Sequence, residues 1–228
     1  MEIELSKENI ETDVIKKKSF ATGINFYKLF WIFYIGCIFG VFVETIWCFV
    51  TNGHFESRTA LILAQLNPIY GLGAVLITLF FATKSNNLFI FCGCGVLGGI
   101  FEYLCSLFQE LIFGTVSWYY SADSLGIFDR TSLIYCMFWG FLGIFWVKVI
   151  YPFLSKTIEK IPNKLGIHLT YILFLLISFD IVFSCKAVYR QTQRRENVEA
   201  TTVIDHFYDT HYTDNILKKI YPNMSIAK

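Results

Sequence analysis

Charged residues are scarce in this chain: they make up 16% of its 228 residues, whereas hydrophobic residues make up 55%. A mean hydropathy of +0.51 is too high for a soluble globular domain and is typical of a protein that crosses the membrane several times. The formal net charge is only +1, which gives no indication of a nucleic-acid partner. Composition therefore predicts an all-α, multi-pass helix bundle in the cell membrane, in contact with lipids.

The sequence also lacks the usual sets of reactive residues. Its seven cysteines all fall within apolar stretches, which argues against a disulfide framework. Cys92 and Cys94 have no nearby histidine or second cysteine pair to complete a zinc site. No Ser, Cys or Thr stands beside a base at catalytic spacing, and no Gly-x-x-x-x-Gly-Lys-Ser/Thr loop is present. We therefore predict no catalytic residue, no metal site and no cofactor.

Apolar runs divide the chain into a polar N-terminal tail (1–25), a transmembrane helical domain (26–189) and a soluble C-terminal tail (190–228). The lengths of the runs predict about five membrane helices. Their expected bounds are 26–50, 68–83, 88–113, 132–154 and 167–189, with the second helix the shortest. Pro68 suits the first turn of that helix, because its missing N–H is not needed there. In the C-terminal tail, residues 214–220 predict one short capped helix.

A glycine stands four residues before a glutamate in two of the apolar runs, as Gly40 with Glu44 and as Gly98 with Glu102. At helical spacing, the two residues of each pair share a face. The glycine lets a neighbouring helix approach closely, so the acid points into that contact and not into lipid. Each pair precedes a polar link that carries one arginine. The pattern predicts a parallel two-helix repeat, with chance similarity as the alternative because the match is short.

The ionisable groups in and between these runs form the candidate site, because a charge at the centre of a membrane helix costs about 2.5–3.5 kcal/mol on insertion scales. The candidate residues of a substrate or ion path are Glu44, Glu102, Arg58, Arg130, Glu110 and Asp180. We expect each arginine to pair with the glutamate of the preceding helix, beside a cavity between the first and third spans. The alternative is that these pairs only hold helices together. Asp180 lies one turn before Ser184, which predicts a local hydrogen bond or a further part of the path.

The charged residues outside the apolar runs give conflicting indications of how the chain is oriented in the membrane. Lysines at 16–18, 28, 84, 156, 160 and 164 favour an N-terminus inside the cell. With five spans, the cations that follow the last run would then lie outside, at Lys186, Arg190, Arg194 and Arg195. The sequence therefore leaves the orientation open.

At these positions the sequence resembles a family of small bacterial membrane proteins described as putative ABC-transporter permeases (type IV, CmpB-like). The resemblance runs from about residue 30 to the tail. It is carried by Gly40-x-x-x-Glu44, Arg58, Pro68-Ile-Tyr70-Gly71-x-Gly73, Glu102-Tyr103, Glu110, Trp118-x-Tyr120-Ser121, Arg130, Trp139-Gly140 and Asp180-x-x-x-Ser184. The chain departs from the family's usual pattern at Thr59, Ala64-Gln65, Tyr119, Gly126 and Asp129. A site that used the aspartate usual at position 119 would be altered here.

The resemblance implies transport, and the missing nucleotide loop implies that any ATPase is a separate chain. The first hypothesis is therefore a permease-like transporter subunit, with lipids, a separate ATPase and further copies of the chain as its expected partners. The second is an intramembrane enzyme, since two carboxylates with arginines could perform acid–base chemistry on a lipid or peptide. The third is a non-catalytic membrane scaffold or sensor that uses the C-terminal tail as its interaction arm.

Overall fold

The computed structural model describes residues 18–120 and 125–227, so the predictions for residues 1–17 and for Ser121 lie outside the described part. Four helices are long and apolar enough to cross a membrane: α2 (Phe26–Asn52), α4 (Asn87–Phe113), the helix Leu133–Glu159 and α7 (Asn163–Arg195). A shorter apolar helix, α3 (Pro68–Phe81), has 14 residues and is about 21 Å long. The all-α membrane architecture is confirmed, and α3 is shorter than the roughly 20 residues that a full span requires.

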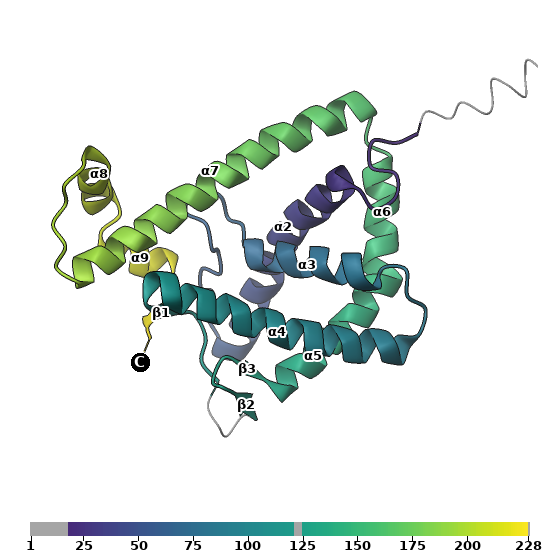
Figure 1. The fold of residues 1–228 in the computed structure, drawn as a ribbon, viewed down its shortest axis with the longest axis horizontal. Coiled ribbons are helices and arrows are strands. Elements are labelled where there is room, and N and C mark those ends of the chain that lie inside the picture. Colours follow the sequence, from purple (N-terminus) through teal and green to yellow (C-terminus); the bar gives the residue numbers. More distant parts are fainter. Residues whose placement is uncertain (1–17, 121–124, 228) are drawn as a thin grey trace, which may run out of the picture.

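Helices α2 and α4 begin and end in the same way, and each contains 27 residues. The side chains of Asn25 and Asn86 cap their first turns by accepting a hydrogen bond from a backbone N–H group. Gly53 and Gly114 end the two helices in the left-handed conformation, with φ of 75° and 59°, which glycine adopts without strain. Figure 1 shows both helices running from the α6 end of the molecule toward the end that holds the C-terminal tail.

The fourth apolar run, predicted to end near residue 154, continues to Glu159 and changes direction on the way. It consists of α5 (Leu133–Phe145), a π-helical turn η2 (Trp146–Ile150) and α6 (Tyr151–Glu159). Pro152 has no N–H group for a helical bond to Lys148, and its ring crowds that carbonyl. The wider turn relieves this conflict and bends the helix. As a result, α6 lies beside the start of α2, where Lys28 meets Glu159 (Figure 1).

Each 27-residue helix packs most closely against the helix that follows it, α2 against α3 and α4 against α5. Gly40 of α2 lies against the ring of Tyr70, and Gly98 of α4 lies against the ring of Trp139. A side chain at either glycine would overlap the ring. These contacts let two helices approach more closely than larger residues would permit, as small residues do in membrane proteins.

The segments after α4 and α7 fold onto the same end of the bundle. The link after α4 contains strands β1 (Thr115–Val116), β2 (Gly126–Ile127) and β3 (Thr131–Ser132), and β2 pairs with β3. The C-terminal tail contains α8 (Val203–His211), α9 (Asp214–Ile220) and β4 (Ser225–Ile226). The helix predicted over 214–220 is confirmed, but the predicted cap is wrong, because Thr213 at its start makes no capping side-chain hydrogen bond. Helix α8 and the extension of α7 to Arg195 were not predicted. Strand β4 pairs with β1, so the tail is attached to the end of α4.

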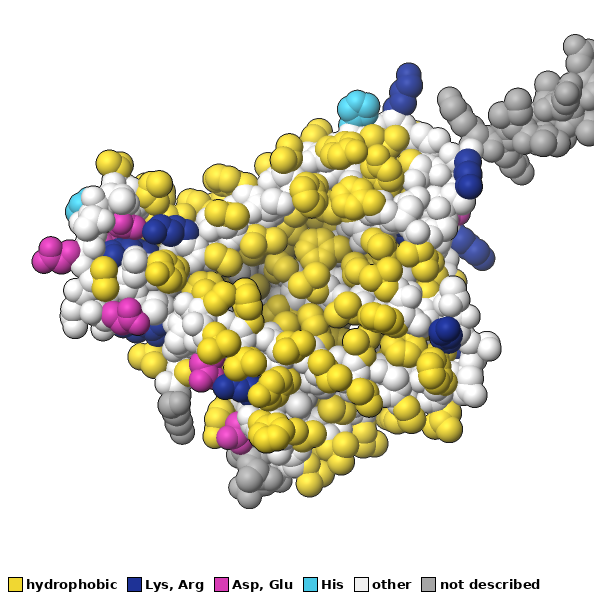
Figure 2. Space-filling view, in the orientation of Figure 1, with side chains coloured by type: hydrophobic (Ala, Val, Ile, Leu, Met, Phe, Trp, Pro, Cys, Tyr) yellow, Lys and Arg dark blue, Asp and Glu magenta, His cyan; other side chains and the backbone are white. Residues whose placement is uncertain are grey.

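The two ends of the bundle use their cations differently. At the α6 end, Lys28 is fully buried and bonded to Glu159 at 2.5 Å. Other lysines at this end make no ion pair among the described residues; they are Lys84, Lys148, Lys156, Lys160 and Lys164. Figure 2 shows dark blue side chains projecting from this end, beyond a face covered largely by hydrophobic side chains. At the opposite end, the cations of α7 bind the tail, in the pairs Lys186–Asp205, Arg190–Asp209, Arg194–Asp209 and Arg194–Asp214.

Asp205 is held both within the tail and by α7. It forms a reciprocal capping box with Thr202 at the start of α8 and lies 3.0 Å from Lys186 of α7. The Thr202 hydrogen bond, with the Lys186 hydrogen bond next, lowers the pKa of Asp205 to about 2. Arg190 likewise lowers the pKa of Asp209. The ionised carboxylates therefore favour the attached tail.

The first prediction concerns the close contact of α4 with α5. Replacing Gly98 with Ala should destabilise the protein by about 1–3 kcal/mol, because the added methyl group overlaps the Trp139 ring. Thermal unfolding of the detergent-solubilised protein measures the loss. Val96→Ala is the matched control on the same helix, since Val96 is 64% exposed and faces away from the contact. Equal melting temperatures for the two variants would contradict the contact.

The second prediction concerns the tail. Because the pKa of Asp205 is lower in the folded protein than in an unfolded chain, its stabilisation is complete above pH about 4 and is lost as the pH falls toward 2. Residues 203–211 should become sensitive to an acid protease across this range. Asp205→Asn should show that sensitivity already at higher pH, whereas the exposed control Glu199→Gln should behave like the unmodified chain.

Candidate functional site

Glu44 is held between α2, α3 and the first link, which is the segment 53–67 that joins these two helices. The Tyr70 hydroxyl of α3 donates to Glu44 Oε2 at 2.6 Å, and Arg58 Nη1 lies 3.7 Å from Oε1. The predicted pairing of Arg58 with Glu44 is therefore confirmed. Arg58 Nη2 also donates to Glu56 at 2.9 Å and to Cys48 Sγ at 3.0 Å. One arginine thus links two carboxylates to the end of α2.

Glu102 is held by neutral donors. The indole N–H of Trp139 donates to Oε1 at 3.1 Å, and the Thr131 hydroxyl donates to Oε2 at 2.9 Å. The predicted pairing of Arg130 with Glu102 is wrong, because Arg130 forms its ion pair with Glu110. Glu110 lies two turns further along α4, level with the link that carries the arginine. The short side chain of Thr131 reaches Glu102, while the longer guanidinium extends to the helix end.

The helix pairs α2–α3 and α4–α5 place equivalent groups in equivalent positions. We call the groups around Glu44 and around Glu102 the two half-sites. Along α2 the series is Gly40, Glu44 and Cys48, and along α4 it is Gly98, Glu102 and Ser106. In each series an aromatic ring of the following helix covers the glycine and donates to the glutamate. In each, the arginine of the following link donates to the third residue, with Arg130 reaching Ser106 Oγ at 3.2 Å. This correspondence supports the predicted repeat. The third member was missed, although the same four-residue spacing points to it.

The second link, between α4 and α5, covers the region of the two half-sites on the side of the C-terminal tail. Trp118 donates its indole N–H to the carbonyl of Arg130 at 3.0 Å, and the backbone N–H of Tyr120 donates to the carbonyl of Asp129 at 3.0 Å. Burial raises the pKa of Tyr120, and the negative charges of Glu102 and, less strongly, of Glu44 raise it further. Gly73 of α3, one turn after Tyr70, faces the Trp139 ring of α5, so the two half-sites are neighbours.

Asp180 holds the first link against α7. Its carboxylate oxygens accept hydrogen bonds from the backbone N–H groups of Leu63 at 3.1 Å and Ala64 at 2.7 Å. Ser184 donates to Asp180 Oδ1 at 3.0 Å and accepts from the N–H of Ile62 at 2.9 Å. The predicted local hydrogen bond is confirmed. These contacts give Asp180 a positioning role for the link that carries Arg58.

The family-motif residues in α3 and α5 either begin a helix or lie where two helices contact each other. Pro68 occupies the first turn of α3, as predicted, after the cap formed by Asn67. Gly71 lies against α2, Gly73 faces the Trp139 ring, and Gly140 lies against α4. The small residues of the motif therefore permit the close helix packing that positions the two aromatic donors.

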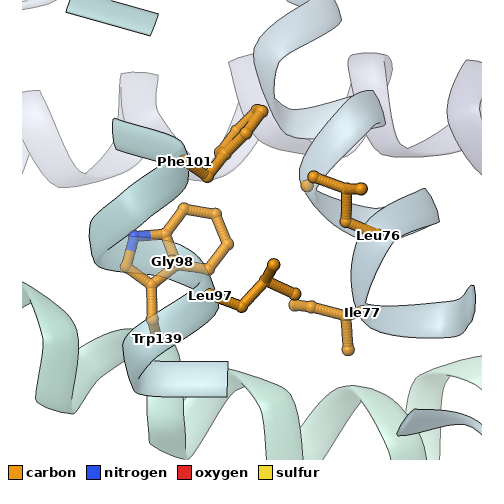
Figure 3. A pocket seen from close by; sticks show the side chains of 7 residues that line it. Leu76, Ile77, Leu97, Gly98, Phe101 and Trp139 are labelled. Atoms are coloured by element: carbon orange, nitrogen blue, oxygen red, sulfur yellow. The ribbon is translucent and has the colours of Figure 1, made fainter. Parts of the chain in front are cut away.

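A small apolar crevice lies beside Glu102's partner Trp139. Its volume is about 10 Å³, which is room for roughly one water molecule. It is lined by Gly73, Leu76, Ile77, Leu97, Gly98, Phe101 and Trp139. Figure 3 shows Trp139 and Phe101 on one side of it, facing Leu76 and Ile77 on the other. The crevice thus lies between α3, α4 and α5, whereas we expected a cavity between α2 and α4.

Within residues 18–120 and 125–227, no three His, Cys, Asp or Glu side chains lie close enough together to hold a metal ion. No curated protein and no solved structure matches the chain. A match to a family is present over residues 31–185, and the description of that family is putative ABC-transporter type IV. The matched region covers more than half of the chain and contains both half-sites. The chain is a multi-pass membrane protein, and it belongs to the putative ABC-transporter type IV family.

Proposed function

We propose that the chain is a permease subunit of an ABC-type transporter, with Glu44 and Glu102 on its substrate or ion path. The ATPase is then a separate chain, because this sequence contains no nucleotide-binding loop. The observation that carries the proposal is the doubled arrangement of a glutamate beneath an aromatic donor, built twice within apolar helices. A single buried ion pair could serve packing alone, whereas two matched acidic sites in one neighbourhood favour a path.

The difference between the two half-sites suggests which one changes charge. Glu44 has the guanidinium of Arg58 nearby at 3.7 Å, so its negative charge is partly balanced. Glu102 forms no ion pair among the described residues and is held by a hydroxyl and an indole N–H. A carboxylate in such surroundings gains most from a proton or a cationic group. Glu102 is therefore our candidate for the group that binds the transported ion or cationic substrate.

The packing suggests how a substrate would reach the glutamates. Tyr70 and Trp139 lie over Gly40 and Gly98 and occupy the space next to the carboxylates. The pair α2–α3 is joined to the pair α4–α5 by the short turn that follows Phe81. Movement of α3 against α2, or of α5 against α4, would withdraw an aromatic ring from its glutamate and open the carboxylate to a substrate.

The third prediction tests the path. Full-length protein is purified from native membranes in mild detergent; the proposal requires an ATPase chain to co-purify and to retain ATP hydrolysis. Glu102→Gln should abolish the pH dependence that Glu102 contributes to this hydrolysis, and Glu44→Gln should lower the rate while membrane insertion is retained. Glu199→Gln in the exposed tail is the control.

Two outcomes would contradict this function. One is that no ATPase accompanies the chain and the two glutamine variants behave like the Glu199→Gln control. The other is that the purified chain alone turns over a lipid or peptide, with the turnover lost in Glu102→Gln. That second result would make the chain an intramembrane enzyme.

The fourth prediction concerns the Arg130–Glu110 pair, whose side chains are 19% and 33% exposed. Arg130→Ala should cost about 1–2 kcal/mol of stability, since it leaves a partly buried carboxylate unpaired and partial exposure reduces the penalty. Lys156→Ala should cost less, because Lys156 has no carboxylate partner in the described part of the chain. Thermal unfolding measures both. If Arg130→Ala/Glu110→Gln is no more stable than Arg130→Ala, the pair does not act as described.

A further inference from the structure

A second pocket lies where the C-terminal tail folds back onto the end of the bundle. Its volume is about 260 Å³. It is lined by Thr115, Gln191, Arg195, Lys218, Tyr221, Met224, Ser225 and Ile226. Figure 1 shows α9 and β4 beside the end of α7 and strand β1, which are the elements that contribute these residues. The volume suits a small polar group and is below that of most drug-sized ligand sites.

The pocket is positively charged. Arg195 and Lys218 line it, and none of its lining residues is acidic. Within the described residues neither cation forms an ion pair, although the neighbouring Arg190 and Arg194 of α7 both do. Arg195 Nη2 donates to the carbonyl of Phe113 at 2.7 Å, so the guanidinium is held in place at the end of α4. Its Nε and Nη1 atoms make no hydrogen bond to the described part of the chain, so these donors remain for a ligand.

Gln191, one of the lining residues, has an unused acceptor that is covered by protein in this conformation. The Oε1 atom of Gln191 is buried and has no hydrogen-bond donor among the described residues. Buried polar atoms are nearly always paired, and an exception needs an explanation. A ligand that suits both features carries an anionic group for Arg195 and Lys218 and a hydroxyl or ammonium hydrogen for Gln191.

The position of the pocket relative to the membrane also favours an anionic ligand. Helix α4 has 27 residues and is about 40 Å long, while the hydrocarbon core of a bilayer is about 30 Å thick. The end of α4, where Phe113 accepts from Arg195, therefore lies at the level of the lipid headgroups. A phosphate ester is the common anion at that level.

We propose that this pocket binds a phosphate ester that also carries a hydroxyl or ammonium group. Arg195 and Lys218 hold the phosphate oxygens, and the Gln191 side chain turns into the pocket to accept from the second group. The ligand is either the headgroup of a phospholipid or a water-soluble phosphate ester of the same chemistry. Since α9 and β4 form part of the wall, an occupied pocket also holds the tail against the end of α4.

The test uses the full chain in detergent, with bound ligand counted by native mass spectrometry. One arm adds phosphatidylglycerol or phosphatidylcholine; the other adds glycerol phosphate or inorganic phosphate. Lys218→Ala should lower the affinity about tenfold, the usual effect of removing one charged hydrogen bond. Gln191→Leu should lower binding of phosphatidylglycerol more than binding of phosphatidic acid, which lacks the second hydroxyl-bearing group. Lys219→Ala is the matched control, because Lys219 is exposed on α9 and does not line the pocket.

The two arms separate the sources of the ligand. Binding of phosphatidylglycerol without binding of glycerol phosphate identifies a lipid site, and the reverse identifies a site for a soluble ester. The proposal is overturned if neither binds, or if Lys218→Ala and Lys219→Ala weaken binding equally, as a general attraction to a basic surface would produce. Protease resistance of the tail is measured in each variant, to show that a loss of binding does not come from a detached tail. If the tail is detached in Lys218→Ala, Gln191→Leu becomes the deciding variant.

Discussion

The close approach of an aromatic ring to a helix glycine is the contact on which the rest of this structure depends. In lipid, helices gain nothing from burying apolar side chains against each other, so association relies on tight packing and on hydrogen bonds. Tyr70 on Gly40 and Trp139 on Gly98 provide both, because the ring fills the space at the glycine and its polar edge donates to a glutamate one turn away. Packing and acid placement are therefore a single arrangement in each half.

That arrangement explains why the apolar part of the fold could be predicted. The hydrophobic runs give the membrane helices directly, and the Gly-x-x-x-Glu spacing places the acids at a helix contact. The breaks at Asn67 and Asn86 mark helix starts through their capping side chains. These features are local, because each depends on residues within one or two helical turns of one another.

The features that were missed depend on contacts between distant segments. The partner of Arg130 is decided by how far the link extends toward the end of α4, which no spacing in the sequence expresses. Helix α8 is short, and its capping box is supported by Lys186 of α7. The bend at η2 follows from Pro152 inside an otherwise apolar run. The apolar pattern continues through that proline, so hydropathy alone gives one uninterrupted helix.

The attachment of both links to later parts of the chain has a consequence for biosynthesis. Asp180 on α7 fixes the first link, the Tyr221 hydroxyl donates to the carbonyl of Ala60 at 3.2 Å, and β4 pairs with the strand that follows α4. The helices around the glutamates can therefore insert in sequence as they leave the ribosome, but neither link can reach its final position until residues beyond 220 have been made. The two polar links are completed last, after the membrane helices are already in place.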